Sequence, residues 1–428
     1  MGIADNSLAC ISGYISYLLT DSGENGHTWL DAQTVIGAVV SALDLKEGDY
    51  PTLGVAINDL SAEGVLGWND AHSRFYLTRL ERLEQSIATE LLRLMDSSPL
   101  PVSVDYQEAL TAIEEKQGWQ FTEEQHSAIV SVLNSNVSII TGPAGTGKSS
   151  VVSGVLALLK GYTFAQCALS GRAAARLSEV TGESGSTIHR LLGYTGGSFN
   201  FNATEQLPYD IIIVDEISMV GAEIFIKLLE AIRSGAKLIM LGDDAQLESI
   251  GSCNIFKDML ESGVVNVGRL TTIHRQAAKS AIITESIKVR KGEQLTDYRW
   301  VGQEVRGELR DLKLNIYGDS ILSLDTLMEE YHALYDNGVP AMDIQIVLPV
   351  KVRGGFCTAA VNDEIQALVN PPKDFKAEVR RAYPSKRKQS SSADDEDAPS
   401  GRKEYILRLG DRVMVTRNMY NTKTPAGA

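Results

Sequence analysis

The strongest constraint on the fold of this chain is residues 137–149, which read Val-Ser-Ile-Ile-Thr-Gly-Pro-Ala-Gly-Thr-Gly-Lys-Ser. A mostly apolar run over 137–140 leads to Gly142 and then, after four further residues, to Gly-Lys-Ser at 147–149. This is the spacing of a phosphate-binding loop, whose glycines let backbone N–H groups surround a polyphosphate at a helix N-terminus. The stretch therefore predicts a strand, a loop and a helix of an α/β nucleotide-binding fold.

Two side chains of this loop have distinct expected roles. Lys148 is expected to neutralise β- and γ-phosphate oxygens, and the Ser149 hydroxyl is expected to hold Mg²⁺. A glycine-rich turn without a ligand is the alternative, but the strand before the loop and the apolar helix over 151–159 favour nucleotide binding. The loop residues predicted to hold the nucleotide are Gly142, Pro143, Ala144, Gly145, Thr146, Gly147, Lys148, Ser149 and Ser150.

A second informative stretch, residues 210–219, reads Asp-Ile-Ile-Ile-Val-Asp-Glu-Ile-Ser-Met. Its four apolar residues predict a buried strand, and Asp215 and Glu216 stand where that strand ends. We expect Asp215 to bind Mg²⁺ through its water shell and Glu216 to orient and deprotonate an attacking water. Uncompensated carboxylates at a buried strand end are costly, so a bound cation is favoured over a purely structural role.

Gln125 precedes the loop and has two interpretations of equal weight. Thr122 with Gln125 three residues later forms a capping-box pattern, which is a sufficient structural explanation. A glutamine amide just before a phosphate loop also offers the paired donor and acceptor that reads the edge of adenine. Both interpretations stay open at the level of sequence.

Polar and basic residues follow other predicted strands, where parallel α/β sheets bind their ligands. After an apolar strand over 162–168, Thr187, His189 and Arg190 are candidates for contacting a nucleic-acid backbone. The alternative is that these three residues cap and solvate a short helix. Residues 194–208 read either as a projecting hairpin or as a surface loop with partly buried aromatic side chains.

Further single residues follow the same logic. Gln246, after the predicted strand 237–241, is expected to sense the γ-phosphate, and Arg275 is expected to stabilise transition-state charge. An apolar run over 343–348 predicts another strand. Its basic loop repeats the pattern of the first domain, with Lys351 and Arg353 as candidate DNA contacts.

The N-terminal region predicts a separate small domain. Residues 29–96 read as helix, helix, hairpin and helix, an order that fits a winged-helix-like unit, and another helix is expected over 106–117. Such units bind DNA or serve as packing modules. Because no helix here is rich in Arg or Lys, the packing role is favoured.

Composition limits the class of protein. The 428 residues allow two or three domains, and no apolar run reaches the length of about 18 to 20 residues that spans a bilayer. The N-terminus shows no signal pattern, so no membrane partner and a cytoplasmic location are expected. A net charge of −15 argues at first sight against nucleic acid, yet binding depends on local charge, and a moving motor gains from weak phosphate contacts.

Taken together, the ordered motifs resemble the RecD-like branch of superfamily 1 helicases, which are 5′-to-3′ DNA motors related to RecD and TraA. The resemblance implies two RecA-like lobes with ATP between them and single-stranded DNA across their tops. It implies that Gln125 contacts adenine, and that Thr187 and His189 lie on the DNA side. The matching stretches are Gln125, 142–149, 171–177, 187–193, 215–219, 242–251, 270–276, 347–354 and 410–418.

The resemblance also implies a domain plan. We expect an N-terminal helical, winged-helix-like domain over 1–100, a first RecA-like ATPase domain over 101–268 and a partial second one over 269–404. The charged, serine-rich stretch 373–403 is expected to be a flexible loop, and 405–428 resembles the opening of an SH3-like insertion. Residues 194–208 fall where relatives carry a strand-separating hairpin.

This chain departs from the family pattern at several positions. Ala168-Leu-Ser-Gly replaces the expected Ala-Pro-Thr-Gly, and Ala245 and Glu248 replace an acid and a proline. The last two helicase motifs find no match, so a truncated or degenerate relative is expected.

The predicted function is an ATP-dependent 5′-to-3′ DNA helicase or translocase, with ATP and Mg²⁺ as cofactors and single-stranded or junction DNA as partner. Nuclease or recombination proteins are further expected partners. The alternatives are a nucleotide- and DNA-binding module without motor activity, and a P-loop ATPase that acts on protein partners.

Overall fold

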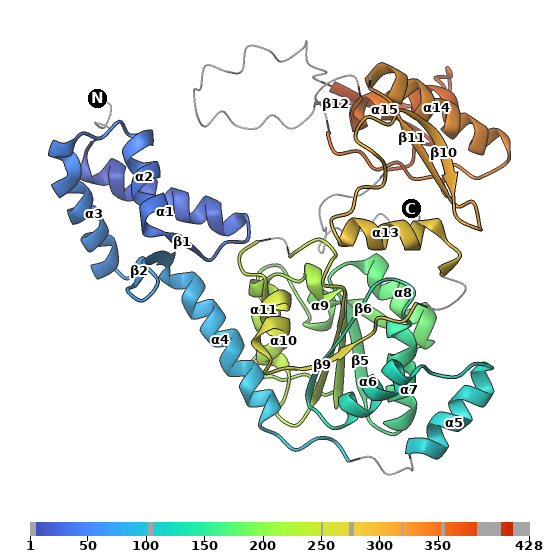
Figure 1. The fold of residues 1–428 in the computed structure, drawn as a ribbon, viewed down its shortest axis with the longest axis horizontal. Helices are drawn as coiled ribbons and strands as arrows, with labels where there is room; N and C mark the ends of the chain where they lie inside the picture. Colours follow the sequence, from blue (N-terminus) through green and yellow to red (C-terminus); the bar gives the residue numbers. More distant parts are fainter. Residues whose placement is uncertain are drawn as a thin grey trace. The chain divides into compact units, whose positions relative to one another are not determined.

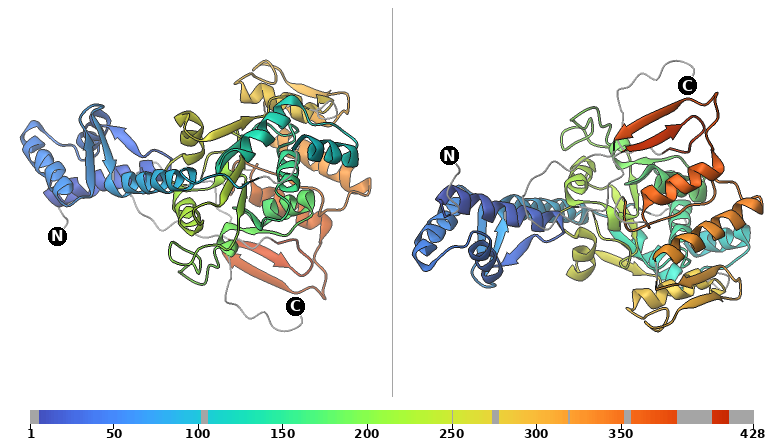
Figure 2. Two further views of the ribbon diagram at one scale, coloured as in Figure 1. Left: turned by 90° about the horizontal axis from the view of Figure 1, so that it is seen from below. Right: turned by 90° about the horizontal axis from the view of Figure 1, so that it is seen from above.

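A computed structural model of the chain describes residues 6–101, 106–249, 251–273, 278–318, 320–351, 356–382 and 404–413. The chain divides into two compact units, residues 1–277 and residues 278–428. Figure 1 and Figure 2 show the elements of both units along the chain.

The first unit is built on a six-stranded sheet in the order β6-β5-β7-β8-β4-β9, in which every neighbouring pair is parallel. This confirms the predicted α/β fold with a phosphate-loop strand in a parallel sheet. The strands are β4 (Val137–Thr141), β5 (Phe164–Ala168), β6 (Gly185–Thr187), β7 (Ile211–Asp215), β8 (Lys237–Gly242) and β9 (Asn266–Arg269).

Helices cover both faces of this sheet because successive strand side chains point to opposite sides. Ile140, Ile211 and Ile213 pack in one apolar cluster with α5 (Tyr106–Gln117), α6 (Glu123–Leu133), α7 (Lys148–Leu158) and α8 (Gly171–Thr181). Ile139 and Val214 face the other cluster, formed with α4 (Thr78–Met95), α10 (Ala222–Ala231) and α11 (Ile255–Ser262). Figure 1 shows the sheet between these two helical layers.

The N-terminal region has its own apolar core and a three-stranded antiparallel sheet in the order β1-β3-β2. The predicted order of helix, helix, hairpin and helix is confirmed. The prediction omitted the first helix and the short strand β1 that pairs with β3. The elements are α1 (Leu8–Glu24), β1 (Trp29–Asp31), α2 (Ala32–Ala42), η1 (Glu47–Asp49), α3 (Tyr50–Ala62), β2 (Leu66–Asn69), β3 (Arg74–Leu77) and α4.

Helix α4 joins this region to the nucleotide-loop sheet. Its Ile87, Leu91 and Leu94 are buried in the same cluster as α10. The Arg93 guanidinium donates to the carbonyl oxygens of Leu229 at 3.0 Å and Ile232 at 2.7 Å, near the C-terminal end of α10. A cation favours that end of a helix because unpaired carbonyls gather there. The N-terminal region is therefore held to the first sheet by packing and by charge.

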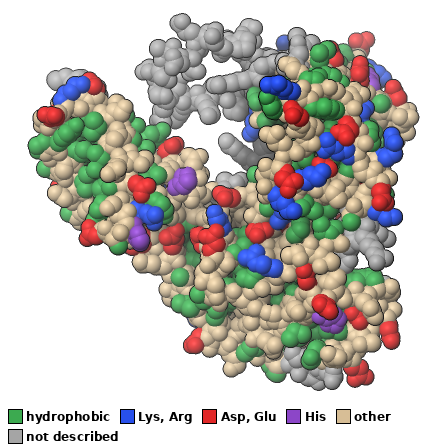
Figure 3. Space-filling view, viewed as in Figure 1, with side chains coloured by type: hydrophobic (Ala, Val, Ile, Leu, Met, Phe, Trp, Pro, Cys, Tyr) green, Lys and Arg blue, Asp and Glu red, His purple; other side chains and the backbone are tan. Residues whose placement is uncertain are grey.

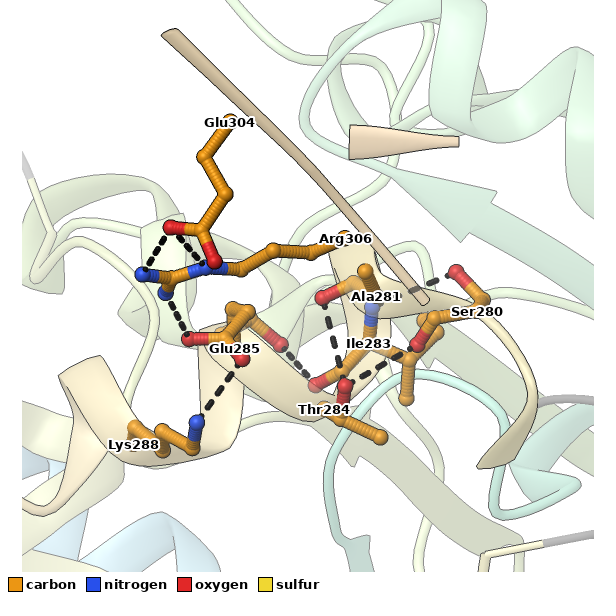
Figure 4. A network of polar contacts seen from close by, with 9 residues as sticks. Ser280, Ala281, Ile283, Thr284, Glu285, Lys288, Glu304 and Arg306 are labelled. Carbon is orange, nitrogen blue, oxygen red and sulfur yellow. Dashed lines mark hydrogen bonds and ion pairs between the residues drawn. The ribbon is translucent and has the colours of Figure 1, made fainter. Parts of the chain in front are cut away.

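The described residues of the second unit form two antiparallel strand pairs, β10 with β11 and β12 with β13. Arg306 on β10 donates to Glu285 on α13 at 2.9 Å and to Glu304 at 2.7 Å, and Lys288 donates to Glu285 at 2.8 Å (Figure 4). This network ties α13 to the hairpin. The elements are α13 (Ala281–Arg290), β10 (Gly302–Arg306), β11 (Leu312–Ile316), α14 (Ser320–Asp336), α15 (Thr358–Val369), β12 (Glu378–Ala382) and β13 (Glu404–Arg408).

The strand predicted over 343–348 is wrong. These residues form no strand, and Val347 is 85% exposed. A buried parallel strand needs a hydrogen-bonded neighbour, and the described residues of this unit supply only antiparallel pairs. The second parallel sheet expected for 269–404 is accordingly not found among the described residues.

The domain limits drawn from the sequence stay predictions. The division between the units falls after Ala277, whereas the predicted limit at 268 lies inside β9. Strand β12 lies within the predicted flexible loop 373–403, of which residues 383–403 are outside the described ranges. Only residues up to 413 of the predicted SH3-like segment are described.

Candidate nucleotide site

The carboxyl ends of β4, β8 and β7 are neighbours in the sheet. The phosphate loop follows β4, Asp243 to Gln246 follow β8, and Asp215 and Glu216 end or follow β7. Loops at the carboxyl edge of a parallel sheet face a common ligand space. The topology therefore brings together three of the segments that the sequence singled out.

Glycine is required at several positions of the phosphate loop. Gly145 and Gly147 have φ angles of +82° and +83°, a left-handed conformation that side chains with a Cβ disfavour. A Cβ on Gly142 would lie 2.3 Å from the carbonyl oxygen of Leu270. Thr146 is buried, and its hydroxyl donates to the Pro143 carbonyl at 2.8 Å. The loop thus has the close-turning backbone that a phosphate cradle needs.

The Lys148 ammonium lies inside this turn. Nζ donates to the carbonyl oxygens of Gly142 at 2.5 Å and Pro143 at 3.3 Å. Its charge favours the ionised forms of both Asp215 and Glu216. An ammonium held at the loop by carbonyl oxygens can exchange them for phosphate oxygens without moving far.

The two carboxyl groups at the end of β7 have an unusual environment. Burial raises the pKa of Asp215, and burial together with the neighbouring Asp215 charge raises the pKa of Glu216. Glu216 has φ +53°, and its backbone N–H donates to Asp215 Oδ1 at 2.9 Å. A left-handed glutamate is strained, and such strain gathers at functional sites. The raised pKa makes Glu216 a stronger base than an ordinary glutamate.

The residues present fit a magnesium nucleotide. Oxygen groups of Ser149 and Asp215 are the hard ligands that Mg²⁺ prefers. The buried hydroxyls of Thr141, at the end of β4, and Ser218, shortly after Glu216, have no hydrogen-bond partner in the described structure. Orphaned buried hydroxyls at this edge leave polar groups for a ligand or its water to satisfy.

Gln125 is 1% exposed, and both the oxygen and the nitrogen of its side-chain amide make hydrogen bonds. Its Oε1 accepts the Thr122 N–H at 3.0 Å, the Thr122 hydroxyl accepts the Gln125 N–H at 3.2 Å, and Nε2 donates to the Thr146 carbonyl at 2.9 Å. The capping box is confirmed. The contact with adenine stays a prediction, and the side chain also supports the phosphate loop.

Gln246 lies in an exposed turn after β8. Its N–H donates to the Asp243 carbonyl at 3.1 Å, and the buried Asp243 carboxylate accepts the Ala245 N–H at 3.1 Å. Its role at the γ-phosphate stays a prediction. Arg275 lies outside the described residues.

Sequence reasoning missed two charged groups near the site. Arg176 on α8 favours the ionised forms of Asp215 and Glu216, and the buried Asp243 disfavours that of Glu216. Arg176 stands in the matched stretch 171–177, and Asp243 follows a predicted strand directly. Their positions in the sequence were the signals from which these two groups could have been found.

Two of the residues predicted to contact DNA, Thr187 and His189, make contacts within the protein. Thr187 caps the short helix α9 (Ile188–Leu191) by accepting the Arg190 N–H at 3.2 Å, so the capping alternative is confirmed for it. The half-buried His189 ring packs edge-on against Tyr194, with ring centroids 5.6 Å apart. Contact of Thr187, His189 or exposed Arg190 with DNA stays a prediction.

The other proposed DNA-side features are only partly described. Tyr194 bridges to Phe199, and Phe199 and Phe201 pack against the main core, as the surface-loop interpretation expects. Lys351 is exposed, and Arg353 lies outside the described residues. On the face shown in Figure 3, acidic and basic side chains are intermixed.

A parallel sheet with a glycine-rich loop and a loop lysine after one strand, and paired carboxylates at the end of the next strand but one, defines a P-loop nucleotide-binding fold of the RecA-like type. Comparison with known proteins identifies a matching family and several relatives. Residues 120–307 match the family described as AAA domain. The chain is 35% identical over 400 residues to the ATP-dependent RecD2 DNA helicase of Deinococcus radiodurans, covering 92% of this chain and 47% of that protein.

A second relative is the RecBCD enzyme subunit RecD of Mycolicibacterium smegmatis, 30% identical over 296 residues, or 61% of this chain and 51% of that protein. The solved structure of the Pif1 helicase from Candida albicans aligns at 19% identity and a TM-score of 0.35, over 62% of this chain and 58% of that one. These comparisons confirm the resemblance to RecD-like helicases that the ordered motifs predicted. It spans about half the length of these curated relatives. Within the described ranges, no helix has the length and apolar content that crossing a membrane requires.

Proposed function

We propose that this chain is the ATP-hydrolysing part of a 5′-to-3′ DNA helicase or translocase of the RecD type. The observation that carries the proposal is that Lys148, Asp215 and Glu216 lie at the same carboxyl edge of the parallel sheet, at the ends of two strands that β8 separates. Opening a base-pair step costs about 1.4 kcal/mol on average, so unwinding requires coupled hydrolysis.

The side chains divide the work of hydrolysis. The loop amides and the Lys148 ammonium bind the phosphates, and Lys148 exchanges its carbonyl acceptors for phosphate oxygens. The Ser149 hydroxyl and the Asp215 carboxylate would hold Mg²⁺, which supplies positive charge to the phosphates when bound. Glu216 orients the attacking water and accepts its proton.

The remaining roles belong to the same proposal. Gln125 contacts adenine, Gln246 and Arg275 respond to the γ-phosphate, and single-stranded or junction DNA is the partner. Because a similar protein is a subunit of the RecBCD enzyme, nuclease or recombination proteins are proposed as further partners. The proposed location is cytoplasmic.

The test is steady-state ATP hydrolysis by the 428-residue chain, with and without single-stranded DNA. Lys148→Ala and Glu216→Gln should each reduce DNA-stimulated turnover by a factor on the order of 100 or more, because each removes a group that acts at the reacting phosphate. Lys160→Ala, at an exposed lysine after α7, is the matched control. Wild-type turnover in both site variants would refute the proposal.

A module that binds nucleotide and DNA without motor activity is the second candidate. It is favoured by the described part of the second unit, whose strands pair only antiparallel. This candidate predicts ATP binding with negligible stimulation by DNA. Strand-specific unwinding of tailed duplexes would exclude both this module and an ATPase that acts on protein partners.

A further inference from the structure

The chain leaves β9 through residues 270–272, here called the exit segment. Leu270 donates its N–H to the Thr141 carbonyl at 2.9 Å, at the end of the strand that precedes the phosphate loop. The Leu270 carbonyl oxygen occupies the space where a Cβ of Gly142 would stand. The exit segment therefore packs directly against the start of the phosphate loop, at Thr141 and Gly142.

The Glu124 carboxylate, which comes 147 positions before Thr271 in the chain, binds this segment. One carboxylate oxygen accepts the N–H groups of Thr271 at 2.7 Å and Thr272 at 2.9 Å, and the other accepts the Thr271 hydroxyl. Partial burial acts to raise the pKa of Glu124, but these hydrogen bonds outweigh it and lower the pKa below its ordinary value. The side chain is thus bound as a carboxylate.

The position of Glu124 in α6 connects this clamp to the loop. It stands in the first turn of the helix, directly before Gln125, whose amide donates to the Thr146 carbonyl of the phosphate loop. The N-terminal turn of α6 is therefore hydrogen-bonded both to the phosphate loop and to the exit segment. Neighbouring Glu123 has the same favourable position near the helix dipole, but it is exposed and makes no such contact among the described residues.

We propose that Glu124 is a positioning residue that clamps the exit segment to helix α6, and that loss of this clamp lowers the rate of ATP turnover more than it lowers the affinity for the nucleotide. The second part rests on the proposed ATPase function. The reason is mechanical. In the sequence, the exit segment precedes residue 278, where the second unit begins. Any coupling between the phosphate loop and the second unit that is carried by the polypeptide backbone must therefore pass through the exit segment.

Two variants separate hydrogen bonding from charge. Glu124→Ala removes every acceptor. Glu124→Gln keeps one oxygen for the two backbone N–H groups, and its NH₂ can donate to the Thr271 hydroxyl, so it should rescue the clamp. Glu123→Ala is the matched control, because it removes a charge from the same helix turn.

The first measurement is amide hydrogen exchange of Thr271 and Thr272 in the full chain. Glu124→Ala should lower the protection of these amides by about tenfold or more, because each loses a hydrogen bond to a charged acceptor. Glu124→Gln should retain most of the protection, and Glu123→Ala should match wild type. Equal protection in Glu124→Ala and wild type would refute the clamp, whether or not the chain hydrolyses ATP.

The second measurement is the kcat and the equilibrium affinity for ATP, with DNA present. We expect Glu124→Ala to lower kcat by about 3- to 30-fold, with affinity changed less than about threefold and kcat restored by Glu124→Gln. Lost protection with a kcat equal to that of Glu123→Ala would refute the dependence of turnover on the clamp. A wild-type chain without turnover would instead refute the proposed function, while hydrogen exchange would still decide the clamp.

Discussion

Gly142→Ala is the substitution whose effect the structure predicts most directly. The added Cβ would lie 2.3 Å from the Leu270 carbonyl oxygen and 3.1 Å from Thr146 Oγ1. Real Cβ contacts essentially never fall below 3.0 Å, so the loop or the exit segment must move by about 0.7 Å. The obstacle is a backbone oxygen that cannot rotate away easily, because the Leu270 carbonyl shares a peptide plane with the Thr271 N–H, which is bonded to the Glu124 carboxylate.

The expected cost follows from this geometry. Forcing an extra methyl group into a packed site costs about 1 to 3 kcal/mol, and here the displaced atoms form the entrance of the phosphate loop. If the displacement is taken up by the loop, ATP affinity should fall by about 5- to 100-fold. Equilibrium titration with a fluorescent ATP analogue measures the affinity, and thermal unfolding measures how much of the cost appears as lost stability.

Gly171→Ala is the control for a methyl group added at another strand end, because the nearest heavy atom to its Cβ would be 4.0 Å away. It should leave the melting temperature and the ATP affinity near wild type. In a Glu124→Ala background, the effect of Gly142→Ala should shrink, since a released exit segment can move away from the new methyl group. An affinity within twofold of wild type together with an unchanged melting temperature would refute the steric reasoning.

Two further predictions concern pH. Burial and the adjacent Asp215 raise the pKa of Glu216, so ATP hydrolysis should be lost on acidification at a higher pH than the ordinary glutamate value of about 4.3. A pH profile of kcat/KM with its acid limb at or below that value would contradict the prediction. Burial lowers the pKa of Lys237 from 10.5 to about 8. Between these two pH values the unfolded chain binds more protons than the folded chain does. The free energy of unfolding should therefore rise with pH across this window, by up to about 3 kcal/mol. Urea unfolding should show this rise in wild type and lack it in Lys237→Met, and an equal slope in both would contradict it.

The sequence predicted the elements whose own residues determine them. Continuous apolar runs marked β4 and β7, helical spacing marked α4 at 78–95, and the Thr122 and Gln125 pair marked the start of α6. The phosphate loop was recognisable because its glycines are needed for backbone reasons that do not depend on distant contacts.

Elements that depend on distant partners were missed or misjudged. Strand β1 has only three residues and forms by pairing with β3, about 45 positions later, so its own sequence carries little signal. The run 343–348 is apolar enough for a buried strand, yet it pairs with no described neighbour. An apolar run therefore indicates the capacity for a strand, and the sheet decides whether that capacity is used.

The candidate site shows the same division between local and distant causes. Lys148 and Asp215 were predicted from motifs, whereas Glu124 was not, because its partners are backbone N–H groups 147 and 148 positions away. Any residue supplies such N–H groups, except proline, so no motif at 271 and 272 can reveal them. The same holds for Lys237, whose ammonium donates to the carbonyl oxygens of Val132 and Leu133 at the end of α6. Helix α6 is thus held at its first turn by an acid and at its last turn by a base. Both contacts involve the helix that carries Gln125, whose amide donates to the Thr146 carbonyl of the phosphate loop. Neither Glu124 nor Lys237 belongs to a nucleotide-binding motif.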